Sequence, residues 1–278
     1  MGDIRKMIGL NMRRYLKNPR LYIALLLTMS AVVFNFGDIT EYLSQYDMQI
    51  QAGELFIFLI SDRYSQWILM FAFLILVGDA PFMHEGMDIL LMRTDKKRWL
   101  KAQIAYMVFV IILWLAFLEI CLVLLTAGYV FFDNKWSDYI LLASRLQQGA
   151  ENIGMGVNVS MLPLTQGKPY LLFGIALLYS ILLYVYFGMW GMAANLLSGH
   201  SYGCLIVTCF LALRFALFNI FYNQKIFFLS PADLVDLTLQ EVNPIMVMYT
   251  TVFFLIQIAV LIFVSEYILS KRDICRMR

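Results

Sequence analysis

The sequence is poor in charged residues and in histidine. Of its 278 residues only 14% are Asp, Glu, Lys or Arg and two are His, whereas 62% are hydrophobic. A soluble domain carries about 25% charged and about 45–50% apolar residues, so a chain of this composition cannot cover its surface with polar groups in water. The composition excludes a water-soluble protein and indicates that lipid is the solvent.

Motifs for catalysis, metal binding or nucleotide binding are also lacking. The two histidines, His84 and His200, have no second ligand at the zinc-protease spacing and no cysteine cluster beside them. The one Gly-Lys pair, Gly167-Lys168, is followed by Pro169 and lacks the upstream glycine of a phosphate-binding loop. We therefore expect no catalytic, cofactor or metal site in this chain, which leaves any ATP and Mg²⁺ to a partner subunit.

Cysteine is scarce as well. Cys121, Cys204 and Cys209 lie in apolar runs and Cys275 lies in the basic tail, so none falls in a predicted external loop. Structural disulfides form in oxidising compartments. The sequence therefore predicts that these residues pack as small hydrophobic side chains.

What the sequence has in abundance is long apolar runs. A helix needs about 20 apolar residues to cross a bilayer, and six runs approach or exceed this length. The longest stretch without an acid or a strong base, 169–213, suits two helices, and Ser198 to Gly203 predicts a tight turn between them. We predict an all-α polytopic membrane protein with a single transmembrane domain, 1–278. Its predicted parts are an amphipathic segment at 1–20, spans at 21–37, 64–83, 102–127, 169–197, 203–224 and 244–267, and a tail at 268–278.

The basic residues predict the orientation. With the N-terminus in the cytosol, fifteen Lys and Arg residues fall in cytosolic segments and five fall outside. Cytosolic loops carry such an excess, so we expect both termini in the cytosol and the protein in a bacterial inner membrane. The first external loop contains an apolar stretch, 55–60, that we expect at the interface or at the outer end of the second span. The same loop carries acids that fit a solvated surface: Asp38, Glu41, Asp47, Glu54 and Asp62.

The first twenty residues have the pattern of a helix that lies along the membrane surface. Apolar side chains recur there at helical spacing with Arg and Lys between them, and Asn18-Pro19 ends the pattern. Such a segment anchors the cytosolic end to anionic lipid or docks on a cytosolic partner, and both interpretations stay open. Its apolar residues are Ile4, Met7, Ile8, Met12 and Tyr15.

The loop between the second and third spans contains an unexpected apolar cluster. A simple connector is polar, yet here apolar residues stand between acids and the basic run 96–98. Such a cluster has to be covered by lipid or by protein. It is either an interfacial helix with snorkelling lysines or a short helix seated on another subunit. Its residues are Glu85, Gly86, Met87, Asp88, Ile89, Leu90, Leu91 and Met92.

A second short helix is predicted outside, before the last span. Ser230 is a good N-cap, Pro231 suits the first helical position and Asp233 suits the first turn. Asn243-Pro244 ends the pattern. We expect a short amphipathic or re-entrant helix near the outer face.

Two charged residues lie within predicted spans. An ionised side chain inside the membrane costs several kcal/mol and usually faces a partner or an aqueous path. Glu119 lies in the outer half of the third span and Arg214 lies about mid-way along the fifth. The sequence therefore suggests that they form an ion pair, which would either fix helix packing or line a translocation path.

This layout resembles the permease subunit of bacterial type-2 ATP-binding-cassette exporters. The shared features are a basic amphipathic elbow, six spans with both ends inside, an apolar cytosolic helix after span two, a tight turn between spans four and five, and a short outer helix before span six. The resemblance covers essentially the whole chain and rests on architecture rather than on a strict motif. The outer loop 128–168 is longer than a minimal member needs.

The resemblance implies a function and partners. Residues 85–92 would be the coupling helix that seats on a cytosolic ATPase subunit, and the elbow would touch the same subunit. Two permease chains, identical or homologous, would pair around a route along spans one, two and five. ATP binding by two cytosolic subunits would switch that route between inward and outward access. The cargo would be a peptide or an amphipathic, drug-like molecule, and no nucleic acid is expected as a partner.

Other functions stay open on the sequence alone. A stand-alone secondary transporter or channel predicts intramembrane acids near mid-depth, broken helices and an inverted repeat. Glu119 is only weak support for the first of these features, and no repeat is evident in the sequence. An intramembrane enzyme is disfavoured by the missing motifs. A non-transporting membrane subunit of a larger complex predicts the same partner-binding loop.

Overall fold

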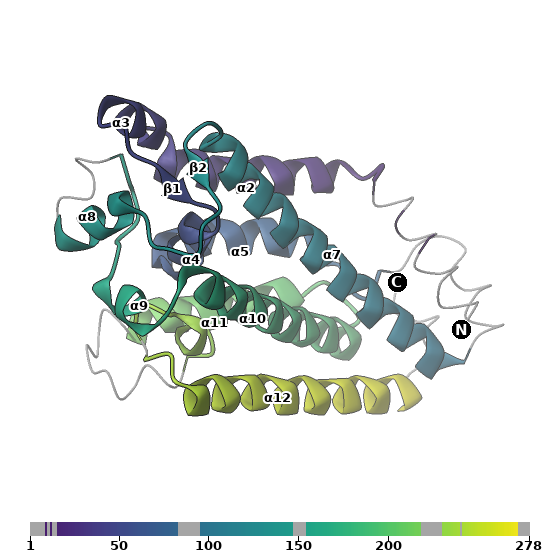
Figure 1. Ribbon diagram of the computed structural model, residues 1–278. Helices are drawn as coiled ribbons and strands as arrows, with labels where there is room; N and C mark the ends of the chain where they lie inside the picture. The colour runs from purple at the N-terminus through teal and green to yellow at the C-terminus, as the bar shows by residue number, and fades with distance from the viewer. Residues whose placement is uncertain are drawn as a thin grey trace.

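A computed structural model describes residues 9, 12, 16–82, 95–146, 154–217, 230–239 and 241–271 of the chain. Within them, long helices lie side by side in an elongated bundle, and short helices and two strands gather at one end (Figure 1). The elements in chain order are α2 (Pro19–Phe36), α3 (Ile39–Gln45), β1 (Ile50–Gln51), α4 (Glu54–Ser61), α5 (Arg63–Val77), α7 (Lys96–Leu125), β2 (Val130–Phe131), α8 (Asp138–Leu146), α9 (Met161–Gln166), α10 (Pro169–Ser198), α11 (Gly203–Ala216), the 3-10 turn η4 (Asp233–Val235) and α12 (Pro244–Lys271).

Four of these helical segments are long and apolar enough to cross a membrane: Pro19–Gln45, α7, α10 and α12. The pair α4 and α5 passes the same test together, although the two helices meet at 88°. Of the described residues in the predicted fifth span, α11 covers only 14. The structure is therefore mostly helical and compatible with an all-α membrane protein, with four or five spans by length. The predicted fifth span, 203–224, and the total of six spans therefore stay predictions.

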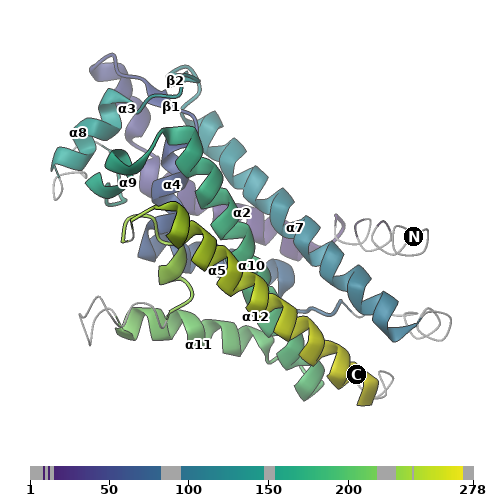
Figure 2. The same ribbon diagram turned by 60° about the horizontal axis from the view of Figure 1, so that its bottom comes forward.

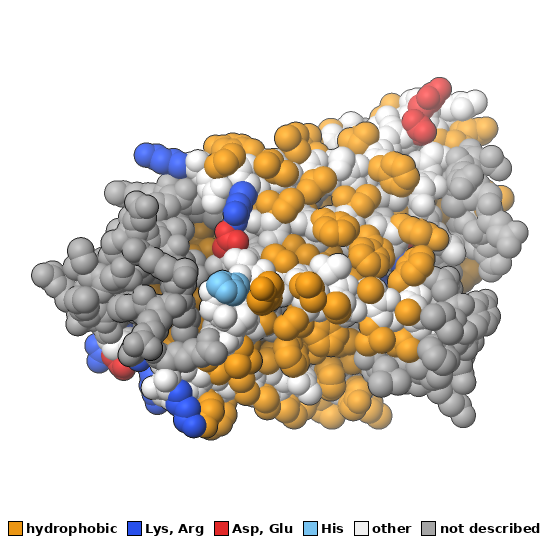
Figure 3. All heavy atoms as spheres, turned by 180° about the vertical axis from the view of Figure 1, so that it is seen from behind, with side chains coloured by type: hydrophobic (Ala, Val, Ile, Leu, Met, Phe, Trp, Pro, Cys, Tyr) orange, Lys and Arg blue, Asp and Glu red, His pale blue; other side chains and the backbone are white. Residues whose placement is uncertain are grey.

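The surface agrees with a lipid environment. On the face drawn in Figure 3, hydrophobic side chains cover the middle, and the Lys and Arg side chains lie toward one end of the molecule. That end is where α7 begins and α5, α10 and α12 finish; we call it the inner end, because the positive charge predicts that it faces the cytosol. The opposite end, which carries α3, α8, α9 and the strands, is the outer end (Figure 1).

Helix α10 occupies the middle of the bundle and α12 the periphery. In the most apolar part of α10, 61% of the residues are buried inside the protein, against 17% for α12. Figure 2 shows α12 beside α10, with α11 below them on the side away from α7. The bounds of α10 agree with the predicted span 169–197, and α12 extends four residues past the predicted end of span six, to Lys271.

The predicted hairpin between spans four and five is confirmed. α10 ends at Gly199, which has a φ of 74°, a left-handed conformation that glycine adopts without steric cost. α11 then begins at Gly203 and packs against α10 so closely that a Cβ atom on Gly203 would lie 2.3 Å from the carbonyl oxygen of Gly191. Gly199 therefore allows the tight turn, and Gly203 allows α11 to touch α10.

The second predicted span ends early. We expect a helix over 64–83, but α5 finishes at Val77 and residues Gly78–Phe82 form turns. The third span conversely begins at Lys96 instead of 102, because the Asp95 side chain accepts a hydrogen bond from the Lys97 amide and caps α7.

The stretch 55–60 is helical and not a turn, and a bend of 88° separates it from α5. It forms the separate helix α4, whose eight residues are all buried. Asp62 separates the two helices because its carboxylate accepts hydrogen bonds from the amide (2.8 Å) and hydroxyl (2.6 Å) of Ser65 and so starts a new helix.

The outer loops are folded rather than open. β1 pairs with β2 in parallel, with Ile50 opposite Val130, and so joins the first and second external loops. Glu54, expected on a solvated surface, is fully buried, and it accepts hydrogen bonds from the amide (2.7 Å) and hydroxyl (2.6 Å) of Ser137, which precedes α8. The prediction for Glu54 was therefore wrong, because Ser137 satisfies its carboxylate internally.

Candidate functional site

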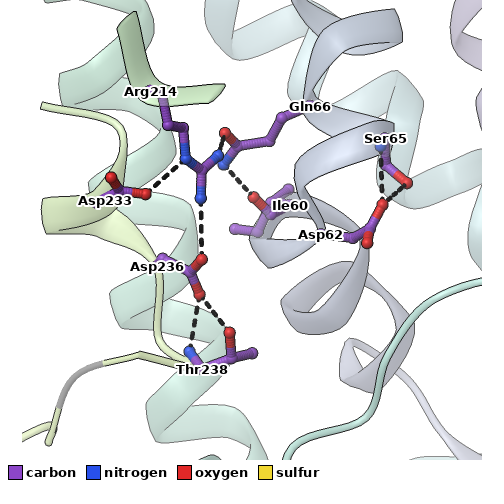
Figure 4. Close-up of polar contacts among 8 residues, drawn as sticks. All are labelled: Ile60, Asp62, Ser65, Gln66, Arg214, Asp233, Asp236 and Thr238. Carbon is purple, nitrogen blue, oxygen red and sulfur yellow. Dashed lines mark hydrogen bonds and ion pairs between the residues drawn. The ribbon is translucent and has the colours of Figure 1, made fainter. Parts of the chain in front are cut away.

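A cluster of buried charges lies where α5, α11 and the segment 230–239 meet (Figure 4). Arg214, near the end of α11, donates from Nε to Asp233 Oδ1 (2.6 Å) and from Nη2 to Asp236 Oδ2 (2.9 Å). Its third nitrogen, Nη1, donates to the side-chain oxygen of Gln66 in the first turn of α5. One guanidinium group therefore joins three segments that are far apart in the sequence.

Two of the three partners of Arg214, Gln66 and Asp236, are themselves held in place. Gln66 donates from its amide nitrogen to the carbonyl oxygen of Ile60 at the end of α4. Asp236 accepts from the amide (2.9 Å) and from the hydroxyl (2.6 Å) of Thr238. The cluster is consequently a preorganised network and not a pair of mobile surface groups.

The cluster is almost completely shielded from solvent. Arg214 is 4% exposed, and Asp233 and Asp236 are each 2% exposed. Arg63, the first residue of α5, interacts electrostatically with both aspartates and adds a second positive charge. Burial raises the pKa of Asp236, against the opposing effects of Arg214 and of the hydrogen bonds from Thr238. The buried Arg214 thus interacts with two buried aspartates in a region of low dielectric.

The expected ion pair between Glu119 and Arg214 is wrong. All three guanidinium nitrogens of Arg214 donate hydrogen bonds to Gln66 and the two aspartates. In the part of the chain that the structure describes, one carboxyl oxygen of Glu119 is buried with no hydrogen-bond partner. The sequence signal that identifies the correct partners is the pair of acids three residues apart, Asp233 and Asp236, inside an otherwise apolar segment.

The predicted outer helix is also corrected. Of the described residues in this segment, only Asp233–Val235 are helical, as a single 3-10 turn, and Asp236 is already extended (φ −80°, ψ 104°). The side chain of Ser230 makes no cap; instead its carbonyl oxygen accepts from the Asp233 amide (3.0 Å). Because both aspartates turn inward to reach Arg214, the backbone forms consecutive turns and not a continuous helix.

A second polar cluster lies at the inner end, around residues Gly78–Phe82, which we call the inner junction. Asn195, in the last turn of α10 and 8% exposed, donates from Nδ2 to the carbonyl oxygens of Gly78 (2.9 Å) and Ala80 (2.7 Å). Its Oδ1 accepts from the amide of Gly203 (2.6 Å), the first residue of α11. The asparagine therefore joins the end of α5 to the start of α11.

The inner junction also contacts α2 and α7. Asp79 forms an ion pair with Arg20 at the start of α2, with both side chains about half exposed. The Phe82 amide donates to Gln103 Oε1 of α7 (3.3 Å), and the Phe82 ring meets the edge of the Tyr106 ring at a centroid distance of 5.0 Å. The chain that leaves α5 is thus held by four helices before it reaches residue 83.

Most of the predicted partner-binding residues lie outside the described part of the chain. This applies to the whole predicted coupling segment, and the structure therefore leaves it as a prediction. Of the elbow residues, Met12 is described; it is partly buried and packs against the apolar core. The residues outside are Ile4, Met7, Ile8, Tyr15, Glu85, Gly86, Met87, Asp88, Ile89, Leu90, Leu91 and Met92.

Within the described residues, no group of three His, Cys, Asp or Glu side chains is placed to hold a metal ion. The described cysteines, Cys121, Cys204 and Cys209, are free thiols. No protein-family model, curated protein or solved structure matches the chain.

Proposed function

We propose that this chain is the membrane-spanning permease subunit of an ATP-driven exporter. Two such chains, identical or homologous, form the translocation route in a bacterial inner membrane, with their termini in the cytosol. Separate cytosolic ATPase subunits bind ATP and Mg²⁺ and dock on residues 85–92 and on the elbow. The cargo is a peptide or an amphipathic molecule.

The observation that carries this proposal is the buried segment 230–237. Instead of passing over the outer surface between α11 and α12, it lies inside the protein, with Ala232, Leu234 and Leu237 at most 2% exposed. Arg214 ties it to α11 and α5. A segment folded back at the outer end and held by a buried charge cluster is a suitable outer gate, because it closes the route until α5 and α11 move.

The proposal is supported further by the arrangement of the helices. The tight hairpin from α10 to α11, the short non-spanning segment before α12 and the turn region after α5 occur in the order that the resemblance requires. In this mechanism the ATPase displaces the cytosolic loop after α5. The displacement then reaches the outer gate through α5 and α11, which both contribute to it.

The test is purification of the full chain from its native membrane in mild detergent. We expect a soluble ATPase to co-purify, and we expect charge reversal at Glu85 and Asp88 to abolish cargo-stimulated ATP hydrolysis while the complex still assembles. A chain that purifies without an ATPase and moves a solute on an ion gradient after reconstitution would contradict the proposal.

That second result would favour a secondary transporter, for which two observations exist: the 88° break between α4 and α5 and the environment of Glu119. Glu119 lies in the outer half of α7 and has a buried carboxyl oxygen with no partner among the described residues. Carboxyl groups inside the membrane mark proton or ion paths in transporters. A third possibility, a non-transporting subunit, predicts a bound partner and no transport by either route.

A further inference from the structure

The two helices that frame the outer gate, α5 and α11, are also joined at their inner ends. The Asn195 side chain uses both of its amide hydrogens on the chain after α5 and its oxygen on the first amide of α11. Among the common polar side chains of this length, only an uncharged amide supplies a double donor and an acceptor together. Aspartate has the same shape but presents a second acceptor to Gly78 and Ala80.

Close contacts reinforce this connection. A Cβ atom on Gly78 would lie 2.4 Å from Cys204 Sγ, so the chain after α5 lies directly against the first turn of α11. Gly203 touches the backbone of Gly191 on α10 in the same way. The end of α5, the last two turns of α10 and the start of α11 therefore pack with no room between them, and closely packed elements transmit displacements.

At the outer end the same helices meet again. Arg214 of α11 binds Gln66 of α5, and the rings of Trp67 and Phe215 lie edge to face with their centroids 6.4 Å apart. α5 and α11 are therefore connected at both ends, with the neutral Asn195 at the inner end and the charge cluster at the outer end.

We propose that Asn195 is the positioning residue that makes the inner junction and the start of α11 move as one unit. With Asn195 in place, a displacement of the chain after α5 carries α11 with it; without it, the chain bends at Gly78 and α11 stays behind. That this displacement moves the outer gate rests on the proposed function. The connection that Asn195 makes between the chain after α5 and the start of α11 does not.

The connection can be tested on the purified chain alone, with Cys204 as a native reporter. Cys121, Cys209 and Cys275 are replaced by serine, and the rate at which N-ethylmaleimide modifies Cys204 is measured in detergent. Asn195→Asp removes the donor and retains the shape. The control Ser198→Ala removes a hydroxyl that bonds only to the backbone of Ala194, Asn195 and His200, and so leaves the Asn195 side chain and its partners intact.

We expect Asn195→Asp to increase the rate about tenfold, since two hydrogen bonds are lost and the carbonyl oxygens meet a carboxylate. Ser198→Ala is expected to change it by less than about twofold. A second single-cysteine chain, which retains only Cys121 on α7, separates local from global effects. If Asn195 acts locally, Asn195→Asp leaves the modification rate of Cys121 unchanged. If Asn195→Asp loosens the whole fold, the rates at Cys121 and Cys204 rise in parallel. A parallel rise, or no rise at Cys204, overturns the proposal.

The movement of α11 is measured by spin labels on Phe71→Cys in α5 and Leu205→Cys in α11, two exposed positions. We expect Asn195→Asp to broaden the distance distribution between them and Ser198→Ala to leave it unchanged; an unchanged distribution in both would contradict the inference. If Asn195→Asp does not yield folded protein, Asn195→Ser, which keeps a shorter donor, is used with the same expectations. No ATPase enters these measurements, so failure of the proposed function and failure of this inference give different results.

Discussion

Removal of the buried cation at the outer gate should destabilise the protein much more than removal of a comparable exposed cation. The substitution Arg214→Met keeps much of the side-chain volume but leaves Asp233 and Asp236, each 2% exposed, without their main partner. Breaking a buried ion pair from one side costs about 3–5 kcal/mol, because an uncompensated charge stays in low dielectric. We expect a loss of this size, which becomes smaller as the pH is lowered and an orphaned aspartate takes up a proton.

A matched control is available in the same chain. Arg20 pairs with Asp79, but the two side chains are 52% and 50% exposed. Solvent-exposed ion pairs contribute at most about 1 kcal/mol, so Arg20→Met should change stability little. Both substitutions remove an arginine that pairs with aspartate; Arg214 is buried and has two aspartates as partners, whereas Arg20 is half exposed and has one.

The measurement is thermal unfolding of the purified chain in one detergent, followed by tryptophan fluorescence. A loss of 3–5 kcal/mol corresponds to a decrease in Tm of about 10 °C for a chain of this size. The triple variant Arg214→Met, Asp233→Asn, Asp236→Asn removes all three charges and should recover much of the loss. If Arg214→Met and Arg20→Met lower the Tm equally, or if the triple variant is no more stable than Arg214→Met, the reasoning from buried charge is refuted.

Three further outcomes are expected. Gly203→Ala should destabilise the chain by about 1–3 kcal/mol, because the added Cβ atom would collide with the Gly191 backbone. A Cβ atom on Gly174 would meet no atom within 4 Å, so Gly174→Ala should be neutral or slightly stabilising in the same thermal assay. Because burial raises the pKa of Asp236, the folded state binds its proton more tightly than the unfolded state, so stability should fall as pH rises through that raised pKa. Asp236→Asn should flatten this slope in unfolding curves recorded over a series of pH values. Glu119→Gln should leave ATP-driven transport within about twofold if the exporter proposal holds, and a loss of ion-coupled uptake in liposomes would favour the secondary transporter.

The sequence predicts the helices well because hydrophobic runs are a direct signal. A span must be apolar over about 20 residues whatever its neighbours are, so α2, α7, α10 and α12 can be located without knowledge of their packing. The hairpin between α10 and α11 is equally local, since Gly199 supplies the left-handed backbone that the turn requires.

The contacts between distant segments are not predictable in this way. Glu119 and Arg214 were paired because both are isolated charges at similar expected depth, but depth does not say which helices are neighbours. The acids that bind Arg214 lie in a segment with the pattern of a surface helix, and the carboxylate of Glu54 lies in a loop with the composition of a solvated surface. In each case the side chain is buried because a partner far away in the sequence satisfies it.

The two connections between α5 and α11 restrict how an outer gate can open. Separating Arg214 from both aspartates inside the protein would cost several kcal/mol, and separating the inner ends would leave the donors of Asn195 and the amide of Gly203 buried without partners. Moving α5, α11, the segment 230–239 and the end of α10 that carries Asn195 together breaks none of these bonds. The contact between Arg20 and Asp79, by contrast, is half exposed and contributes little. We therefore expect the gate to open by displacement of this whole unit, with the inner junction as the point where a force from the cytosol enters it.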